Sequence, residues 1–194
     1  MNHSSPAPCI SVYENALNTE DVGQFIKALN EKINEGWSEL GWGNSGVGVT
    51  GVVSAHRTSL GCSLMPLMKP YEPTALSVLF DKAVRIPIEE LIKDYTSENI
   101  LPLGPYEPYS VLKYLPGSEY HAHYDHFRDN SRVFSMVAIL GEPDSGGQLE
   151  FPTFGVTVEP KFGSVIVFPS NFPYLHVAHE VKAGIKYSLV SWYQ

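Results

Sequence analysis

The stretch QLEFPTFGVTVEPKFGSVIVF, residues 148–168, contains three short runs of β-favouring residues, at 148–151, 156–158 and 164–168. Glycine and proline residues, which are typical of turns, separate the runs. The separations are too short to hold helices. Closely spaced strands of this kind predict an antiparallel sandwich or jelly roll.

The second half of the chain continues this pattern. Further β-rich runs lie at 109–114, 132–140 and 186–193. In the first half, apolar residues recur instead at helical spacing. We therefore expect one α+β domain spanning 1–194, with a double-stranded β-helix (jelly roll) core at roughly 103–194 and supporting N-terminal helices at roughly 14–98.

Two helical segments are expected in front of the core, after a short strand at 9–13. The first follows a capping-box-like sequence that begins at Asn18, and it ends near Gly36. The second covers 73–95, where Pro87 is expected to break or restart the helix. Both are amphipathic, so we expect them to pack on the sheet.

The stretch GVGVTG at 46–51 formally matches the dinucleotide-binding pattern G-x-G-x-x-G. That pattern normally follows a buried strand and opens a helix, whereas here a glycine-rich loop precedes it and Val-Val-Ser follows. We therefore interpret the stretch as a loop or the entry to a strand.

The composition is that of a folded, acidic protein, with 43% hydrophobic residues and a net charge of -8. Negative charge repels phosphate backbones, so nucleic acid is not an expected partner. No apolar run reaches the roughly 18 residues that a membrane span needs, and the N-terminus lacks the pattern of a signal peptide. Cys9 and Cys62 form no disulfide pattern. These features predict a cytoplasmic protein without a membrane partner.

Five of the seven histidines lie in two clusters, and the first cluster reads HAHYDH, residues 121–126. His121, His123, Asp125 and His126 match the zinc pattern H-x-H-x-D-H and so resemble the metallo-β-lactamase hydrolases. The context does not fit that family, because no buried strand precedes the motif and the β-rich remainder of the chain is short. A cupin-like pairing of His121 with His123 lacks a nearby downstream glutamate.

Another interpretation pairs His123 with Asp125, which lie two positions apart and would share one face of a strand. The second cluster, with His176 and His179, would supply a third ligand. Two histidines and one carboxylate on one face of a metal leave three open positions, as in non-haem Fe(II) oxygenases. 2-Oxoglutarate can occupy two of these positions and dioxygen the third. The distal carboxylate of 2-oxoglutarate needs a cation, and Lys186 follows His176 by ten positions.

Four stretches around these positions occur in the order typical of one family. They are YLPGSEYHAHYD at 114–125, GGQLEFP at 146–152, EPKFG at 159–163, and the run at 176–192. Through them the sequence resembles the prolyl 4-hydroxylase-like branch of the Fe(II)/2-oxoglutarate-dependent dioxygenases. The likeness continues more loosely through 9–17 and 56–59, so it covers most of the chain.

The resemblance implies Fe(II) bound by His123, Asp125 and His176. It pairs the C5 carboxylate of 2-oxoglutarate with Lys186, and ascorbate becomes a possible reductant. His179 is the less suitable third ligand, because it lies only seven residues before Lys186. The retained carboxylate of Asp125 favours hydroxylation over halogenation, since the related halogenases lack it.

Three further residues are assigned to the co-substrate site by the same resemblance. Tyr114 matches a tyrosine that hydrogen-bonds 2-oxoglutarate, and Trp192 lies in the matching C-terminal run. Leu149 stands where the family often has threonine, so we expect an apolar wall beside the co-substrate at this point.

The resemblance also gives a substrate class, namely prolyl residues in a peptide or protein. Arg132 matches an arginine that lies near the peptide in relatives, and Arg57 belongs to a segment, 56–65, that resembles a mobile closing loop. Tyr124, Tyr120 and Trp192 are candidates for aromatic walls around a proline ring. The alternatives are a hydroxylase of a free amino acid or other small molecule, a zinc hydrolase, and a non-catalytic jelly-roll binding module.

Overall fold

A computed structural model describes residues 1–45, 55–68, 72–126 and 131–194. The glycine-rich stretch at 46–51 lies outside these residues. None of the helices in the described ranges is both long and apolar enough to cross a membrane.

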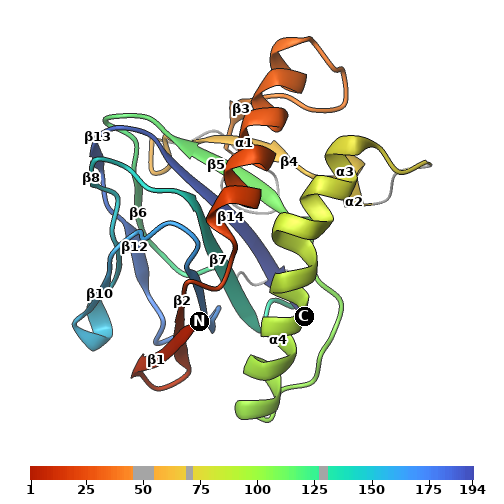
Figure 1. Ribbon diagram of the computed structural model, residues 1–194. Helices are drawn as coiled ribbons and strands as arrows, with labels where there is room; N and C mark the ends of the chain where they lie inside the picture. Colours follow the sequence, from red (N-terminus) through yellow and green to blue (C-terminus); the bar gives the residue numbers. More distant parts are fainter. Residues whose placement is uncertain (46–54, 69–71, 127–130) are drawn as a thin grey trace.

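Two antiparallel sheets face each other in the described part of the chain (Figure 1). The major sheet has the order β1-β2-β11-β7-β14-β5-β4-β3. Its strands are β1 (Asn2–Ala7), β2 (Ile10–Glu14), β3 (Gly43–Asn44), β4 (Leu60–Ser63), β5 (Ser110–Tyr114), β7 (Phe134–Gly141), β11 (Val165–Pro169) and β14 (Lys186–Tyr193). This arrangement agrees with the jelly-roll core expected from the sequence.

The minor sheet has the order β10-β9-β12-β6. Its strands are β6 (Tyr120–His123), β9 (Leu149–Phe151), β10 (Val156–Val158) and β12 (His176–Ala178), and β8 (Ser145–Gly146) pairs with β13 (Val181–Ala183) beside it. A 3₁₀ turn, η2 (Pro152–Phe154), connects β9 to β10. The short strands β12 and β13 were not expected from the sequence.

The helices cover the face of the major sheet that points away from the minor sheet (Figure 1). They are α1 (Thr19–Asn34), α2 (Met65–Met68), α3 (Ala75–Phe80) and α4 (Ile86–Glu98), with the π turn η1 (Asp81–Arg85) between α3 and α4. Asn18 caps α1 by accepting hydrogen bonds from the backbone N–H groups of Glu20 and Asp21. The helix expected after Asn18 is therefore confirmed.

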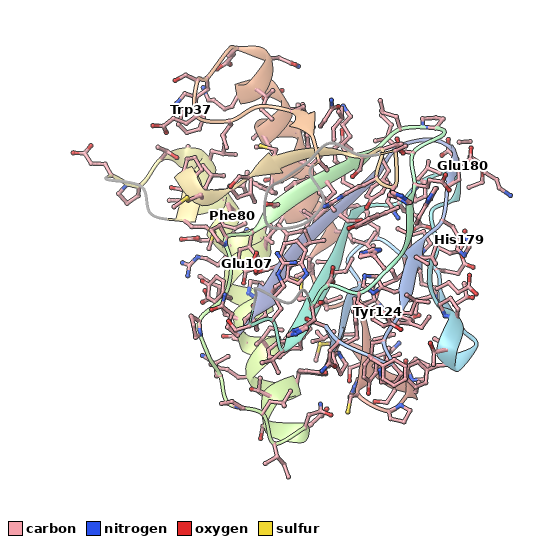
Figure 2. All side chains as sticks on the ribbon, turned by 180° about the vertical axis from the view of Figure 1, so that it is seen from behind. Trp37, Phe80, Glu107, Tyr124, His179 and Glu180 are labelled. Carbon is pink, nitrogen blue, oxygen red and sulfur yellow. The ribbon has the colours of Figure 1, made fainter. Side chains whose placement is uncertain are left out.

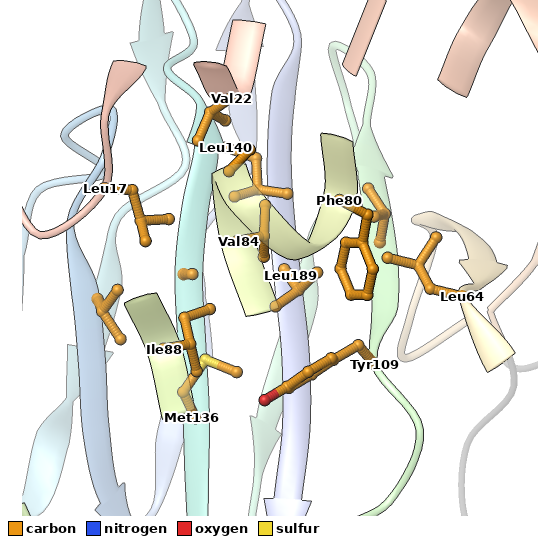
Figure 3. Close-up of a cluster of buried hydrophobic side chains, with 14 of the residues drawn as sticks. Leu17, Val22, Leu64, Phe80, Val84, Ile88, Tyr109, Met136, Leu140 and Leu189 are labelled. Atoms are coloured by element: carbon orange, nitrogen blue, oxygen red, sulfur yellow. The ribbon is translucent and has the colours of Figure 1, made fainter. Parts of the chain in front are cut away.

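Alternation along β7 separates two regions of the core. Phe134, Met136, Ala138 and Leu140 pack under the helices, in a cluster that includes Phe80, Val84 and Ile88 (Figure 3). Val137 and Ile139 point the other way, toward the minor sheet. The space between the sheets is therefore lined by the opposite side chains of the same strands.

Two local expectations were wrong, and one was met. The helix restarts at Pro87 as expected, because the π turn η1 ends α3 and Pro87 falls in the first turn of α4, where an N–H is not needed. Asp125 does not share a strand with His123, since β6 ends at His123. Residues 60–63 of the expected closing loop form β4, which is paired with β3 and β5.

Candidate metal centre

Antiparallel pairing of β6 with β12 places His123 opposite His176. Asp125 follows β6 at a bend, and its two carboxylate oxygens lie 3.5 Å from the Nε2 atoms of His123 and His176. The three ligand atoms lie within 4.8 Å of one another, and no other such group of three occurs in the described part of the chain. Two imidazoles and one carboxylate thus converge, as expected from the sequence.

Backbone carbonyls orient both imidazoles. His123 Nδ1 lies 2.7 Å from the carbonyl oxygen of His121, and His176 Nδ1 lies 3.2 Å from that of Tyr174. A carbonyl oxygen only accepts, so each Nδ1 carries the proton and donates it. Each Nε2 then presents a lone pair to the centre of the group, which is the form that binds a metal.

The charges of the group also suit a cation. Burial alone would raise the pKa of Asp125, but the electrostatic effects of His176 and His123 outweigh it, and the pKa falls below its usual range. Burial lowers the pKa of His176 to about 4. At neutral pH the centre therefore holds an ionised carboxylate and a neutral His176 imidazole, the protonation states that metal ligands require.

A narrow apolar cavity extends from this centre between the sheets to Lys186. Lys186 is 3% exposed, and burial lowers its pKa to about 8. Its Nζ donates to the carbonyl oxygen of Gly147 over 2.7 Å and lies 4.3 Å from the centre of the Tyr114 ring. No carboxylate of a described residue lies within ion-pair distance of Nζ. The cavity therefore ends in a buried cation that lacks a protein counter-charge among these residues.

The predicted co-substrate residues all line this cavity. Leu149 contributes to an apolar wall together with Ile139 and Ile166. Tyr114 is buried, which raises its pKa, and its hydroxyl interacts with the side chains of Arg57 and Ser59. Trp192 lies at the metal-centre end, where its side chain hydrogen-bonds Asp125.

A second, wider space, the hollow, opens beside the metal centre. Its volume is about 310 Å³, against about 50 Å³ for the cavity, and both spaces are lined by Arg57, Asp125 and Trp192. Arg132 lies in this hollow, and its guanidinium group stacks 3.7 Å from the centre of the Trp192 ring. Two hydrogen bonds join Arg132 to the carboxylate of Glu107. Arg57 stacks over Tyr120, 4.8 Å from the ring centre.

Not every predicted aromatic residue lines these spaces. Tyr124 is half-buried and lies 6.5 Å from Phe172, ring centre to ring centre, and it borders neither the cavity nor the hollow. In Figure 2, Tyr124 lies apart from Glu107, the residue that pairs with Arg132 in the hollow. Tyr120 stacks directly on the His123 ring, at 3.5 Å between ring centres, so it supports that imidazole.

The other histidines lie outside the centre. His179 pairs with Glu150 over 2.6 Å at the outer side of the minor sheet (Figure 2). His126 hydrogen-bonds the carbonyl oxygen of Arg132, and His121 pairs with Glu119. The side chain of His121 thus points away, and only its backbone carbonyl supports the centre.

Three residues near the centre were not predicted from the sequence, namely Glu107, Ser135 and Ser170. Ser135 donates a hydrogen bond to Asp125 Oδ2 over 2.7 Å, and Ser170 contacts Ser135. The sequence did contain a signal for Ser135, because Ser135 alternates with Val137 and Ile139 and so shares their face of the strand. A polar residue on the buried face of a strand is unusual. Glu107 gave no comparable signal.

Residues 109–194 match the family described as the 2OG-Fe(II) oxygenase superfamily. Prolyl 4-hydroxylase 13 of Arabidopsis thaliana is 27% identical over 120 residues, which are 47% of this chain and 44% of that protein. The chain thus spans less than half the length of this curated relative.

Two solved structures resemble almost the whole chain. A prolyl-4-hydroxylase of Pseudomonas putida is 25% identical, with a TM-score of 0.69 over 95% of this chain and 92% of that chain. A prolyl hydroxylase of Trichoplax adhaerens, solved in complex with a hypoxia inducible factor oxygen degradation domain peptide fragment, is 15% identical, with a TM-score of 0.71 over 95% of this chain and 82% of that chain. The predicted fold class is confirmed.

Proposed function

We propose that the protein is an Fe(II)- and 2-oxoglutarate-dependent hydroxylase of prolyl residues, because residues 109–194 match the 2OG-Fe(II) oxygenase superfamily and the similar proteins are prolyl 4-hydroxylases. The observation that carries the proposal is the arrangement of one cavity. The His-Asp-His group and the buried ammonium group of Lys186 line this same cavity. The zinc-hydrolase and binding-module alternatives are not favoured by the comparisons.

The donor set fits a ferrous ion. His123, Asp125 and His176 would hold Fe(II) through two neutral nitrogen atoms and one carboxylate, which is the ligand set of non-haem iron oxygenases. Fe(II) and 2-oxoglutarate together supply the oxidising chemistry, in which dioxygen hydroxylates a C–H bond and 2-oxoglutarate is converted to succinate and carbon dioxide.

The part of the cavity at Lys186 fits the distal carboxylate of 2-oxoglutarate. The Lys186 ammonium group would gain the counter-charge that it lacks among the described residues, and a charge-assisted hydrogen bond in a buried site is strong. The apolar wall that includes Leu149 would exclude water along the carbon chain of the ligand. Tyr114, beside Lys186, is placed to orient the same carboxylate.

The hollow beside the metal centre is the proposed place of a proline-containing peptide. Arg57 and Arg132 line it with Trp192, so it offers guanidinium and aromatic surfaces next to Asp125. Glu107 pairs with the Arg132 guanidinium group, which lies over the Trp192 ring, so both contacts fix the place of Arg132 in the wall of the hollow. Tyr124 borders neither space, so we assign it no direct contact with the peptide.

The test measures succinate in anaerobically prepared protein that receives Fe(II), 2-oxoglutarate, ascorbate, air and a library of proline-containing peptides. We expect succinate to depend on the peptide, and the product peptide to gain the mass of one oxygen atom on proline. His123→Ala and Lys186→Ala should abolish both signals, whereas Lys182→Ala on the exposed side of β13 should not. Peptide-independent turnover with free proline, or activity that needs zinc and ignores 2-oxoglutarate, would contradict the proposal.

A further inference from the structure

Two buried serines hold the side chain of Asp125. Ser135, the second residue of β7, donates its Oγ–H to Asp125 Oδ2 over 2.7 Å. Ser170 follows β11, and its Oγ lies 2.8 Å from the Oγ of Ser135. The two serines are 1% and 0% exposed, so bulk water does not compete for these bonds.

The direction of the hydrogen bonds follows from the charge of Asp125. An ionised carboxylate only accepts hydrogen bonds, and a serine hydroxyl has one proton to donate. Ser135 therefore gives its proton to Asp125 and accepts the hydroxyl proton of Ser170. The result is a one-way chain from Ser170 through Ser135 to Asp125, in which each bond polarises and strengthens the next.

The same strands also hold the backbone of Asp125. The carbonyl oxygen of Ser170 accepts hydrogen bonds from the N–H groups of Asp125 and His126, over 3.1 and 2.9 Å. Ser170 is fixed in turn, because its N–H donates to the carbonyl oxygen of Val133 and the register pairs Phe168 with Ser135. Backbone and side chain of Asp125 are thus set by one pair of strands, although Asp125 lies in a bend outside both.

We propose that Ser135 is a positioning residue for the metal, and that Ser170 completes its action. Without the Ser135 hydroxyl, Asp125 Oδ2 would lose its serine donor, and the carboxylate could turn about its terminal torsion, which has a broad energy minimum, even with the Trp192 hydrogen bond in place. Losing such an outer partner typically weakens metal binding by about 10- to 100-fold. The inference rests on the proposed function, since it takes Asp125 as an iron ligand.

The experiment measures binding of Fe(II) by anaerobic calorimetry and the visible absorption of the Co(II)-substituted protein, which reports ligand geometry without turnover. Ser135→Ala should weaken Fe(II) binding by about 10- to 100-fold and alter the Co(II) spectrum. Ser170→Ala should have a smaller effect in the same direction. Ser135→Thr, which keeps the hydroxyl, should restore both signals.

Ser164→Ala is the matched control. Ser164 is also 1% exposed and donates to a carbonyl oxygen, that of Lys161, but it does not touch Asp125. Its Fe(II) affinity and Co(II) spectrum should equal those of the wild type. The proposal is overturned if Ser135→Ala binds Fe(II) as tightly as the wild type with an unchanged Co(II) spectrum, or if Ser135→Thr fails to restore them. Wild-type protein that binds no Fe(II) would instead refute the proposed function.

Discussion

The two faces of the major sheet differ in what they bury. The helix-covered face is almost wholly apolar, with aromatic rings such as Phe25, Phe80 and Tyr109 in mutual contact. The face toward the minor sheet carries the carboxylate of Asp125 and the ammonium group of Lys186, both nearly inaccessible to water. Burying charged groups costs free energy unless they are paired, whereas burying rings contributes it. The first face therefore stabilises the fold, whereas the second carries buried charged groups, which lower the stability unless they are paired.

Phe80→Ala tests the helix-covered face and should have the largest effect on stability. The ring is fully buried between Phe25 and Tyr109, so its removal leaves a cavity and should cost about 3–5 kcal/mol of the free energy of unfolding. Chemical denaturation followed by circular dichroism measures this. Val78→Ala on the same helix is the control, because Val78 is 57% exposed. Fe(II) affinity of the remaining folded Phe80→Ala protein should match the wild type; a loss there would mean that the two faces are coupled.

Asp125→Ala tests the opposite face and should have the next largest effect. Loss of a proposed ligand should weaken Fe(II) binding by more than the roughly 100-fold that outer partners contribute. The stability of the metal-free protein should fall as well, because the lowered pKa shows that the fold stabilises this carboxylate, and the buried Ser135 hydroxyl would lose its acceptor. Calorimetry with Fe(II) and denaturation in a chelator measure the two quantities. Asp125→Ala protein that still binds Fe(II) tightly would exclude Asp125 as a ligand.

Lys186→Met should lower 2-oxoglutarate affinity and raise stability together. Loss of a hydrogen bond to a charged group costs about 2–3 kcal/mol, which is about 30- to 150-fold in Kd. Lys186 has no carboxylate partner among the described residues, so replacing its buried charge by an apolar side chain of similar length should stabilise the ligand-free protein by about 1–3 kcal/mol. Lys182→Met, an exposed lysine on β13, is the control for both measurements. If Lys186→Met is less stable than the wild type, Lys186 has a structural role that the cavity does not reveal.

Sequence alone predicted the reactive groups of this second face better than their surroundings. His123, Asp125, His176 and Lys186 belong to short motifs whose residue types and spacings are restricted by the chemistry. Long strands such as β7 and β14 were also predictable, because eight residues carry a clear apolar pattern. The strands β12 and β13 have three residues each, too few for any periodicity to be detected.

The supporting contacts depend on strand register, which local sequence does not encode. Ser170 reaches Ser135, 35 positions away, only because β11 pairs with β7 in one particular register. Arg132 and Glu107 lie just before β7 and β5, so their contact depends on how both strands pair with β14, which lies between them. A one-residue shift in any of these pairings would turn the side chains to the other face of the sheet. Such contacts become predictable only when the pairing of the strands is known.

The smallest expected effect is that of pH, through the ionisation of Lys186. Raising the pH should increase the stability of the ligand-free protein and weaken the binding of 2-oxoglutarate. Burial lowers the Lys186 pKa from its usual 10.5 to about 8, so the unfolded chain binds more protons than the folded one between these values. Stability of the ligand-free protein should therefore rise through this pH range. 2-Oxoglutarate needs the protonated amine, so its Kd should be constant below pH 8 and rise about tenfold per pH unit above it. Calorimetry and denaturation of wild-type and Lys186→Met protein isolate both trends, because the tyrosines that do not contact Lys186 contribute equally to the two proteins. A wild-type Kd that stays flat to pH 10 would show that the co-substrate carboxylate does not depend on the charge of Lys186.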